Sequence, residues 1–227
     1  MLVAARNILK SWLLVLALTG VFALVGWLLD GVRGLSIFAF CALLLAAGAY
    51  WTFDRVVLGM IGARELPVGE APLLHSTVER LAARAGIVKP RLYLIPDGLP
   101  IAAATGRGVR SSALAMSTGC VAACTPAELE GVLAHELAHV KHRDILISSV
   151  AATLAAAIMM SARFAMFFGG GRDDDQRGGN PIALIAMMIL APIAAMLIQA
   201  AISRSREYDA DAGGASIAGS PLGLVSA

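Results

Sequence analysis

The segment His135-Glu-Leu-Ala-His139 carries two histidines and a glutamate at a spacing that suits a zinc peptidase. Histidines four residues apart on an α-helix lie on one face, one turn from each other. Both imidazoles can therefore reach a single zinc ion, with nitrogens about 2.0–2.1 Å from the metal. Glu136 would lie beside that ion and could accept a proton from a water molecule there. The pattern predicts hydrolysis of peptide bonds, with Glu136 as general base; the alternative is two surface histidines on an amphipathic helix.

The residues around the motif favour a helix that would hold it in place. Thr125 and Pro126 are typical of an N-cap followed by proline at the first helical position, and Glu128 falls in the first turn. No further proline occurs up to His142. An apolar face for this helix is supplied by Val132, Leu133, Leu137 and Val140. This context favours the zinc interpretation.

A catalytic zinc site usually has three protein ligands and one open position, so another ligand must come from elsewhere. His142 would lie about 10 Å from His135 along the helix axis, which is too far for both to bind one ion. His75 is the only other histidine, and we interpret it as a structural residue on the exposed side of a separate helix. Glu207, directly after the last apolar run of the chain, is the better candidate.

Asp211 lies four residues after Glu207, so the two acids would share one face of a helix. We expect Asp211 to accept a hydrogen bond from the second ring nitrogen of a ligand histidine, which would fix the tautomer of that ring. The alternative is a juxtamembrane segment in which Arg204 and Arg206 bind lipid headgroups. That alternative leaves the one-turn spacing of the two acids unexplained. The nitrogen and oxygen donors predict one Zn²⁺ per chain.

The composition is typical of a membrane protein. Of the 227 residues, 58% are hydrophobic and 15% are charged, whereas about 25% are charged in an average soluble domain. The net charge of +2 gives no case for nucleic-acid binding. Cys41, Cys120 and Cys124 are too few for a disulfide framework or a cysteine zinc site. We expect them to be buried thiols.

Four apolar runs are each about long enough to cross a bilayer as a helix, for which about 20 residues are needed. They cover residues 12–29, 35–53, 145–168 and 182–202. The first run is too long for the apolar core of a signal peptide, so we expect a retained anchor. Basic residues precede the first and third runs and follow the second and fourth. By the positive-inside rule, both termini and the middle segment face the cytoplasm.

These runs divide the chain into four parts. Residues 1–53 form one membrane hairpin and residues 145–202 a second, while residues 203–227 form a cytoplasmic segment. The insert at residues 54–144 is predicted to contain an amphipathic helix, short strands and then the motif helix. The helix is expected over residues 70–85, and the strands at 91–95, 101–105 and 113–118. The predicted fold is a mostly α integral membrane protein, with four transmembrane helices and a small cytoplasmic α+β zinc-peptidase domain.

The paired motifs resemble those of the HtpX-like membrane metalloproteases, relatives of the CAAX prenyl proteases. The resemblance rests on residues 135–144 and 203–211 and on the order of the apolar runs, and it covers nearly the whole chain. It implies zinc-dependent endoproteolysis of membrane proteins, damaged or misfolded ones in particular, in quality control and stress response at the bacterial inner membrane. Two departures stand out. Residues 101–106 read Ile-Ala-Ala-Ala-Thr-Gly where the family has Asn-Ala-Phe-Ala-Thr-Gly, and family members continue for some tens of residues beyond the position of Ala227.

The resemblance also implies that an extended substrate pairs with an edge strand, which we place at residues 113–118. The expected contacts are Ala113, Leu114, Ala115 and Met116. The expected partners are polypeptide substrates and the lipid bilayer, and the sequence makes no prediction of oligomeric state.

Two other classes of protein are alternatives. A catalytically inactive metal-binding scaffold would close its zinc site with a fourth protein ligand, whereas the sequence offers three good ligands and an intact Glu136. A transporter or channel would carry functional polar groups inside the membrane, where only Arg163 and Gln199 qualify. The peptidase interpretation is therefore preferred.

Overall fold

The computed structural model describes residues 2–145, 148, 192, 196 and 204–227. The chain forms two compact units. The first contains Met1–Lys10, Trp51–Ser149 and Ser203–Ala227, and the second contains Ser11–Tyr50 and Val150–Ile202. Both zinc motifs therefore belong to the first unit, together with the beginning of the chain.

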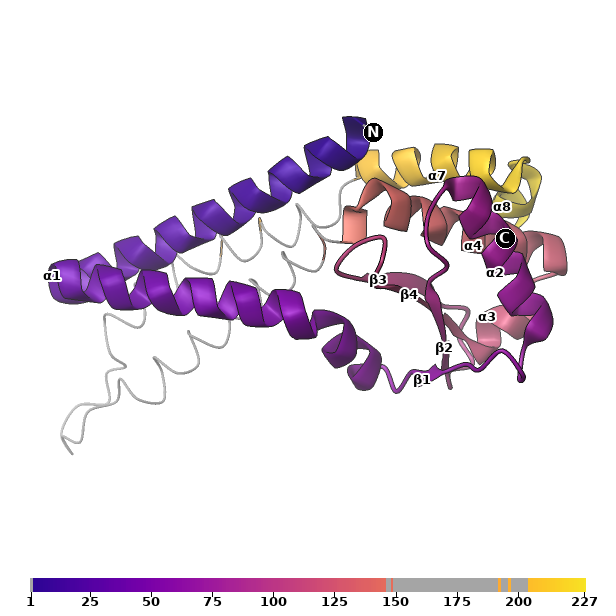
Figure 1. Ribbon diagram of the computed structural model, residues 1–227, viewed down its shortest axis with the longest axis horizontal. Helices are drawn as coiled ribbons and strands as arrows, with labels where there is room; N and C mark the ends of the chain where they lie inside the picture. The colour runs from indigo at the N-terminus through magenta and orange to yellow at the C-terminus, as the bar shows by residue number, and fades with distance from the viewer. Residues whose placement is uncertain (1, 146–147, 149–191, 193–195, 197–203) are drawn as a thin grey trace. The chain divides into compact units, whose positions relative to one another are not determined.

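Helix α1, Leu2–Met60, contains both predicted N-terminal apolar runs (Figure 1). Asp30 and Gly31 depart from helical geometry and divide the helix into two arms. Gly31 has a φ of 55°, which glycine adopts without steric cost. The stretches Val3–Leu24 and Asp30–Thr52 are each long and apolar enough to cross a membrane.

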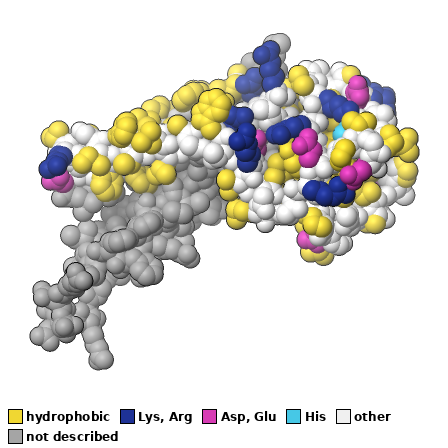
Figure 2. Space-filling view, turned by 60° about the horizontal axis from the view of Figure 1, so that its bottom comes forward, with side chains coloured by type: hydrophobic (Ala, Val, Ile, Leu, Met, Phe, Trp, Pro, Cys, Tyr) yellow, Lys and Arg dark blue, Asp and Glu magenta, His cyan; other side chains and the backbone are white. Residues whose placement is uncertain are grey.

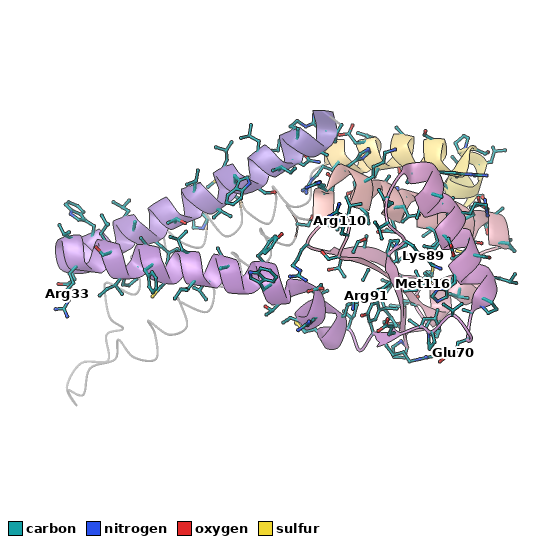
Figure 3. All side chains as sticks on the ribbon, in the orientation of Figure 1. Arg33, Glu70, Lys89, Arg91, Arg110 and Met116 are labelled. Atoms are coloured by element: carbon teal, nitrogen blue, oxygen red, sulfur yellow. The ribbon has the colours of Figure 1, made fainter. Side chains whose placement is uncertain are left out.

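The two arms of α1 approach each other closely at Gly26 and Gly34. A Cβ atom on either glycine would overlap the backbone carbonyl of the other, so only glycine permits this contact. Apolar side chains such as Trp12 and Phe40 are exposed along the arms, and charge is found near the kink, where Arg33 lies (Figures 2 and 3). Such a surface suits contact with lipid tails.

Two of the four predicted membrane spans are thus represented by helices of suitable length and composition. The other two, at residues 145–168 and 182–202, lie almost wholly outside the described residues. The prediction of buried thiols is correct for Cys120 alone, because Cys124 is half-buried and Cys41 is exposed.

The first unit contains a four-stranded mixed sheet. Its strands are β1 (Arg64–Glu65), β2 (Arg91–Ile95), β3 (Ala102–Gly106) and β4 (Ser112–Ser117). The strand order is β1-β2-β4-β3, with β2 and β4 parallel and the other neighbours antiparallel. The three predicted strands are confirmed to within one residue, and the two-residue β1 is additional.

The first unit also contains helices that pack on this sheet or on one another. They are α2 (Pro72–Ala85), α3 (Thr118–Ala123), α4 (Pro126–His142), α7 (Arg204–Ala218) and α8 (Leu222–Ser226). One hydrophobic core joins α2, α4 and α7 to the sheet. Helix α4 therefore has a buried side that fixes it against the strands and a side that meets α7.

Strand β4 is one of the two interior strands of the sheet, and its residues are buried on both faces. Leu114 and Met116 point into the core shared with α2, α4 and α7. Ala113 and Ala115 lie on the other face and pack against Leu58, near the end of α1. Both edges of β4 are already hydrogen-bonded, to β2 and to β3. The prediction that a substrate pairs with these four residues is therefore wrong, because no edge of β4 is open.

His75 lies on α2 and is buried, not exposed as the sequence suggested. Its Nε2 atom lies 2.9 Å from the carbonyl oxygen of Leu66 and forms a hydrogen bond with it. This contact ties α2 to the segment that follows β1. His75 thus has a structural role.

Candidate active site

Helix α4 has well-defined ends. The Thr125 hydroxyl accepts a hydrogen bond from the amide of Glu128 (3.3 Å), and the Glu128 carboxylate accepts one from the amide of Thr125 (2.8 Å). This reciprocal cap, with Pro126 in the first turn, confirms the predicted start of the helix. At the other end Arg143 has φ 60° and ψ 29°, a left-handed conformation that reverses the chain. The chain therefore folds back at Arg143, and Asp144 lies close to α4.

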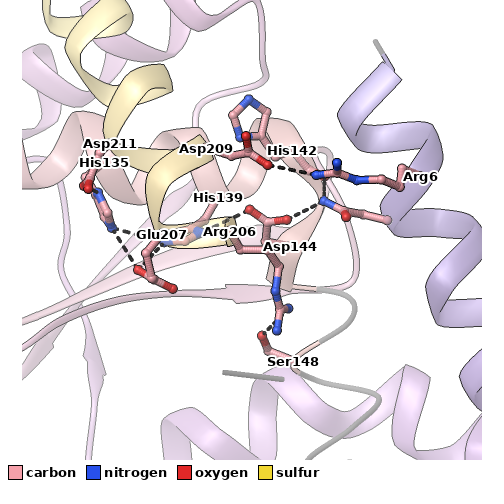
Figure 4. A network of polar contacts seen from close by, with 11 residues as sticks. Arg6, His135, His139, His142, Asp144, Ser148, Arg206, Glu207, Asp209 and Asp211 are labelled. Carbon is pink, nitrogen blue, oxygen red and sulfur yellow. Dashed lines mark hydrogen bonds and ion pairs between the residues drawn. The ribbon is translucent and has the colours of Figure 1, made fainter. Parts of the chain in front are cut away.

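Three side chains from α4 and α7 converge on one point (Figure 4). The Nε2 atoms of His135 and His139 lie 3.1 Å apart. The Oε2 atom of Glu207 lies 3.7 Å from the first nitrogen and 3.6 Å from the second. Ligands about 2.0–2.1 Å from a tetrahedral zinc ion are about 3.4 Å from one another, so a zinc ion fits among these atoms. Two histidines and a glutamate are the donor set of catalytic sites that leave one position open.

Each of the two histidines has a carboxylate at its second ring nitrogen. The Nδ1 atom of His135 lies 2.9 Å from Oδ1 of Asp211, and the Nδ1 atom of His139 lies 3.2 Å from Oδ2 of Asp144. Such contacts orient an imidazole with its Nε2 toward the metal and raise its basicity as a ligand. Asp211 was expected beside a ligand histidine from its spacing in the sequence, and Asp144 was not. In the sequence, the one indication of a role for Asp144 was its place as an acidic residue just past the end of the motif helix.

Glu136 lies beside the metal-binding group and faces strand β3. The backbone amide of Ala104 on β3 donates a hydrogen bond to the Glu136 carboxylate. Burial raises the pKa of Glu136, while the nearby His139 and His135 act to lower it and Glu207 adds to the increase. The half-buried carboxyl group thus lies next to the three side chains that converge on the metal position.

The amino-acid sequence matches the model of Peptidase family M48 over residues 69–227. This range includes both zinc motifs. The chain belongs to peptidase family M48. This membership confirms the interpretation of the chain as a metalloprotease. M48 peptidases use zinc, which suits the three side chains that converge at this site.

Relatives of this M48 chain are named Protease HtpX homolog. The one from Persephonella marina is 49% identical over 221 residues, which cover 96% of this chain and 77% of the relative. The one from a Sulfurihydrogenibium species is 50% identical over 225 residues, or 97% and 76% of the two chains. The one from Methylibium petroleiphilum is 49% identical over 221 residues, or 97% and 78%. The resemblance to HtpX-like proteases is confirmed, and no solved structure matches the chain.

Two glycines of α7 allow this helix to pack closely on α4, so that Glu207 of α7 reaches the metal-binding group. A Cβ atom on Gly214 would lie 2.9 Å from Cα and 3.0 Å from N of His135. A Cβ atom on Gly213 would lie 2.9 Å from Cβ of Ala138 and 3.0 Å from Cε1 of His142. Side chains at these positions would push the helices apart. This glycine pair was not predicted, although adjacent glycines inside a helix are costly and indicate close packing.

The remaining candidate residues lie outside the metal-binding group. His142 is not a member of it, as its distance along the helix predicted. Arg206 is buried, and its Nη1 atom donates a hydrogen bond to Oγ of Ser148 at 3.4 Å (Figure 4). The interpretation of Arg206 as a lipid-binding side chain is therefore wrong, whereas Arg204 is exposed.

Proposed function

We propose that this M48 protein is a membrane-anchored zinc endopeptidase that cleaves membrane proteins, misfolded or damaged ones in particular. In this proposal, His135, His139 and Glu207 hold one zinc ion per chain, Asp211 orients His135, and Glu136 is the general base. The observation that carries the proposal is the spacing of the three ligand atoms, 3.1 to 3.7 Å from one another. That spacing is close to the distance between two ligand atoms of a tetrahedral zinc ion.

The chemistry follows from the groups that surround this position. When bound, zinc polarises the scissile carbonyl and lowers the pKa of water toward about 7. Glu136 accepts a proton from the attacking water and delivers it to the leaving amine as the C–N bond breaks. Asp144 accepts a hydrogen bond from Nδ1 of His139, and the Asp211 carboxylate lies beside Nδ1 of His135, so that each Nε2 lone pair can face the metal.

Strand β3 offers a place for an extended substrate beside the base. It is an edge strand, with β4 on one side and no strand on the other among the described residues. The amide of Ala104 on β3 already reaches the Glu136 carboxylate, so a chain that adds to this edge would lie next to the base. Main-chain hydrogen bonds along an edge give affinity with little demand for particular side chains. This property suits a protease that acts on varied unfolded segments.

The two apolar arms of α1 support anchorage in a membrane, which we propose is the bacterial inner membrane. Basic residues precede the first apolar run, at Arg6 and Lys10, and follow the second, at Arg55 and Arg64. By the positive-inside rule, these residues favour a cytoplasmic catalytic domain. Substrates would then be membrane proteins whose cytoplasmic segments reach the site.

Cysteine labelling tests this orientation. In a background whose native cysteines are replaced by alanine, Val32→Cys lies at the exposed kink of α1 and Arg110→Cys on the exposed β3–β4 turn. A membrane-impermeant thiol reagent should label the first in intact cells and the second only after lysis. Labelling of both from the same side would contradict the orientation.

The experiment that tests the catalytic assignment is a comparison of zinc content and cleavage for Glu136→Gln. This variant should retain zinc, because Glu136 is not a ligand, and its cleavage of an unfolded membrane protein should fall by about 10²–10⁴-fold. Glu79→Gln, on the exposed side of α2, is a matched control that should cleave like the wild type. Loss of zinc from Glu136→Gln would contradict the assignment. A zinc-loaded wild type that never cleaves would favour the inactive scaffold.

A further inference from the structure

Asn7, near the start of α1, is fully buried within the first compact unit. Its Nδ2 atom donates a hydrogen bond to Oδ1 of Asp144 and a second, 3.0 Å long, to the carbonyl oxygen of His142. A carboxylate and a backbone carbonyl are both acceptors. The amide must therefore present its NH₂ group to them, which fixes its orientation.

Asp144 connects this amide to the metal-binding group. Its carboxylate is buried, with only 3% of the residue exposed. One oxygen accepts from Asn7, and the other lies 3.2 Å from Nδ1 of His139. Figure 4 shows Asp144 between His139 and the N-terminal segment that carries Arg6. A buried carboxylate is held in one orientation when each oxygen has its own donor, because rotation would break one bond or the other.

We propose that Asn7 is a positioning residue for the zinc ligand His139 and acts through Asp144. The proposal rests on the proposed function, since it requires His139 to bind zinc. The amide fixes one oxygen of Asp144, so that the other oxygen holds Nδ1 of His139 and turns Nε2 toward the metal. The first turns of the membrane helix are then part of the support of the active site as well as an anchor.

Packing alone does not explain an asparagine at this position. Burial of an amide is costly unless it is hydrogen-bonded, and asparagine has a lower helix propensity than leucine or alanine. An apolar side chain would fill the space at lower cost. Arg6, in the same turn, pairs with Asp209 of α7 at 2.9 Å, but this ion pair is exposed and solvent-screened. It ties the turn to α7 and makes no contact with Asp144.

Chelator competition on the purified chain measures its zinc affinity and so tests the proposal. Asn7→Leu keeps the branched shape of the side chain, with slightly more volume and no amide, and Asn7→Ala is the second, smaller variant. Both should bind zinc about tenfold more weakly, at the low end of the effect of removing an outer hydrogen-bond partner of a metal ligand. The visible absorption bands of the cobalt-substituted protein should also change, because they report the ligand geometry. Arg6→Gln is the matched control and should keep its zinc Kd within about twofold of the wild-type value.

A double-mutant cycle separates positioning from packing. In an Asp144→Ala background, Asn7→Leu should cause no further loss of zinc affinity, because both side chains act through one carboxylate. An additive loss, or an unchanged zinc Kd and cobalt spectrum in both Asn7 variants, would overturn the proposal. Glu207→Ala distinguishes this failure from that of the metal site. If Glu207→Ala loses zinc while Asn7→Leu binds normally, only the positioning role is wrong.

Discussion

The Nδ1 atom of His135 lies 2.9 Å from Oδ1 of Asp211, one helical turn beyond Glu207 on α7. One helix therefore contributes both a metal-binding carboxylate and the group that orients a ligand on the facing helix. Any change in the packing of α7 on α4 should affect both at once. The position of α7 is thus as important for the site as the histidine motif itself.

Removal of the Asp211 carboxylate should weaken zinc binding without abolishing it. Asp211→Ala should raise the zinc Kd by about 10–100-fold, since such partners orient the ligand histidine. Asp211→Asn keeps one acceptor oxygen and should recover part of the loss. Asp209→Ala, on the same helix, is the control, because Asp209 pairs at the surface with Arg6. Wild-type affinity in Asp211→Ala would show that this carboxylate does not support the metal.

Alanine at Gly214 should destabilise the protein, although alanine in place of glycine in a helix usually adds about 1 kcal/mol of stability. The new Cβ would lie 2.9 Å from Cα of His135, so α7 must shift away. We expect a loss of about 1–3 kcal/mol in the free energy of unfolding, as for other overpacked sites, together with weaker zinc binding. Ser216→Ala, exposed on the same helix, should change neither. Denaturant titration measures both variants, and a more stable Gly214→Ala would disprove the close contact.

The cap of α4 should make stability depend on pH in the acid range. Hydrogen bonds from the backbone and side chain of Thr125 lower the pKa of Glu128 from its ordinary value of 4.5. Because the folded pKa lies below the unfolded one, Glu128 stabilises the fold above pH 4.5, and this contribution is lost as pH falls through the folded pKa. Glu128→Gln should thus unfold more readily than the wild type above about pH 5 and match it in stronger acid. Glu65→Gln, at an exposed position of β1, is the control, and a Glu128→Gln deficit that persists unchanged into strong acid would contradict the assignment.

Local regularities of the sequence predicted the core of the site. The four-residue spacings of His135 with His139 and of Glu207 with Asp211 determine which side chains share a helix face, because helical geometry is constant. The cap at Thr125 was equally local. Those predictions needed no knowledge of how the helices pack.

The features that sequence reasoning missed depend on tertiary structure. Asp144 reaches His139 only because Arg143 is left-handed, and helical periodicity does not extend past that residue. Asn7 lies 137 residues from Asp144 along the chain, so no local pattern connects them. The sequence did contain a sign that β4 is not the strand that pairs with substrate. The residues of β4 from Ala113 to Met116 are all apolar, which is typical of a strand buried on both faces and not of an edge.

The zinc content of Glu207→Ala tests the account most directly. The protein is purified in detergent with zinc buffered at a micromolar level, and bound metal is measured against protein. The wild type should retain about one zinc ion per chain, and Glu207→Ala should lose most of it, because two histidines alone leave the site short of a ligand. Asp209→Ala, two residues away on α7, should retain zinc. Full zinc occupancy in Glu207→Ala would contradict the assignment of His135, His139 and Glu207 as the metal site.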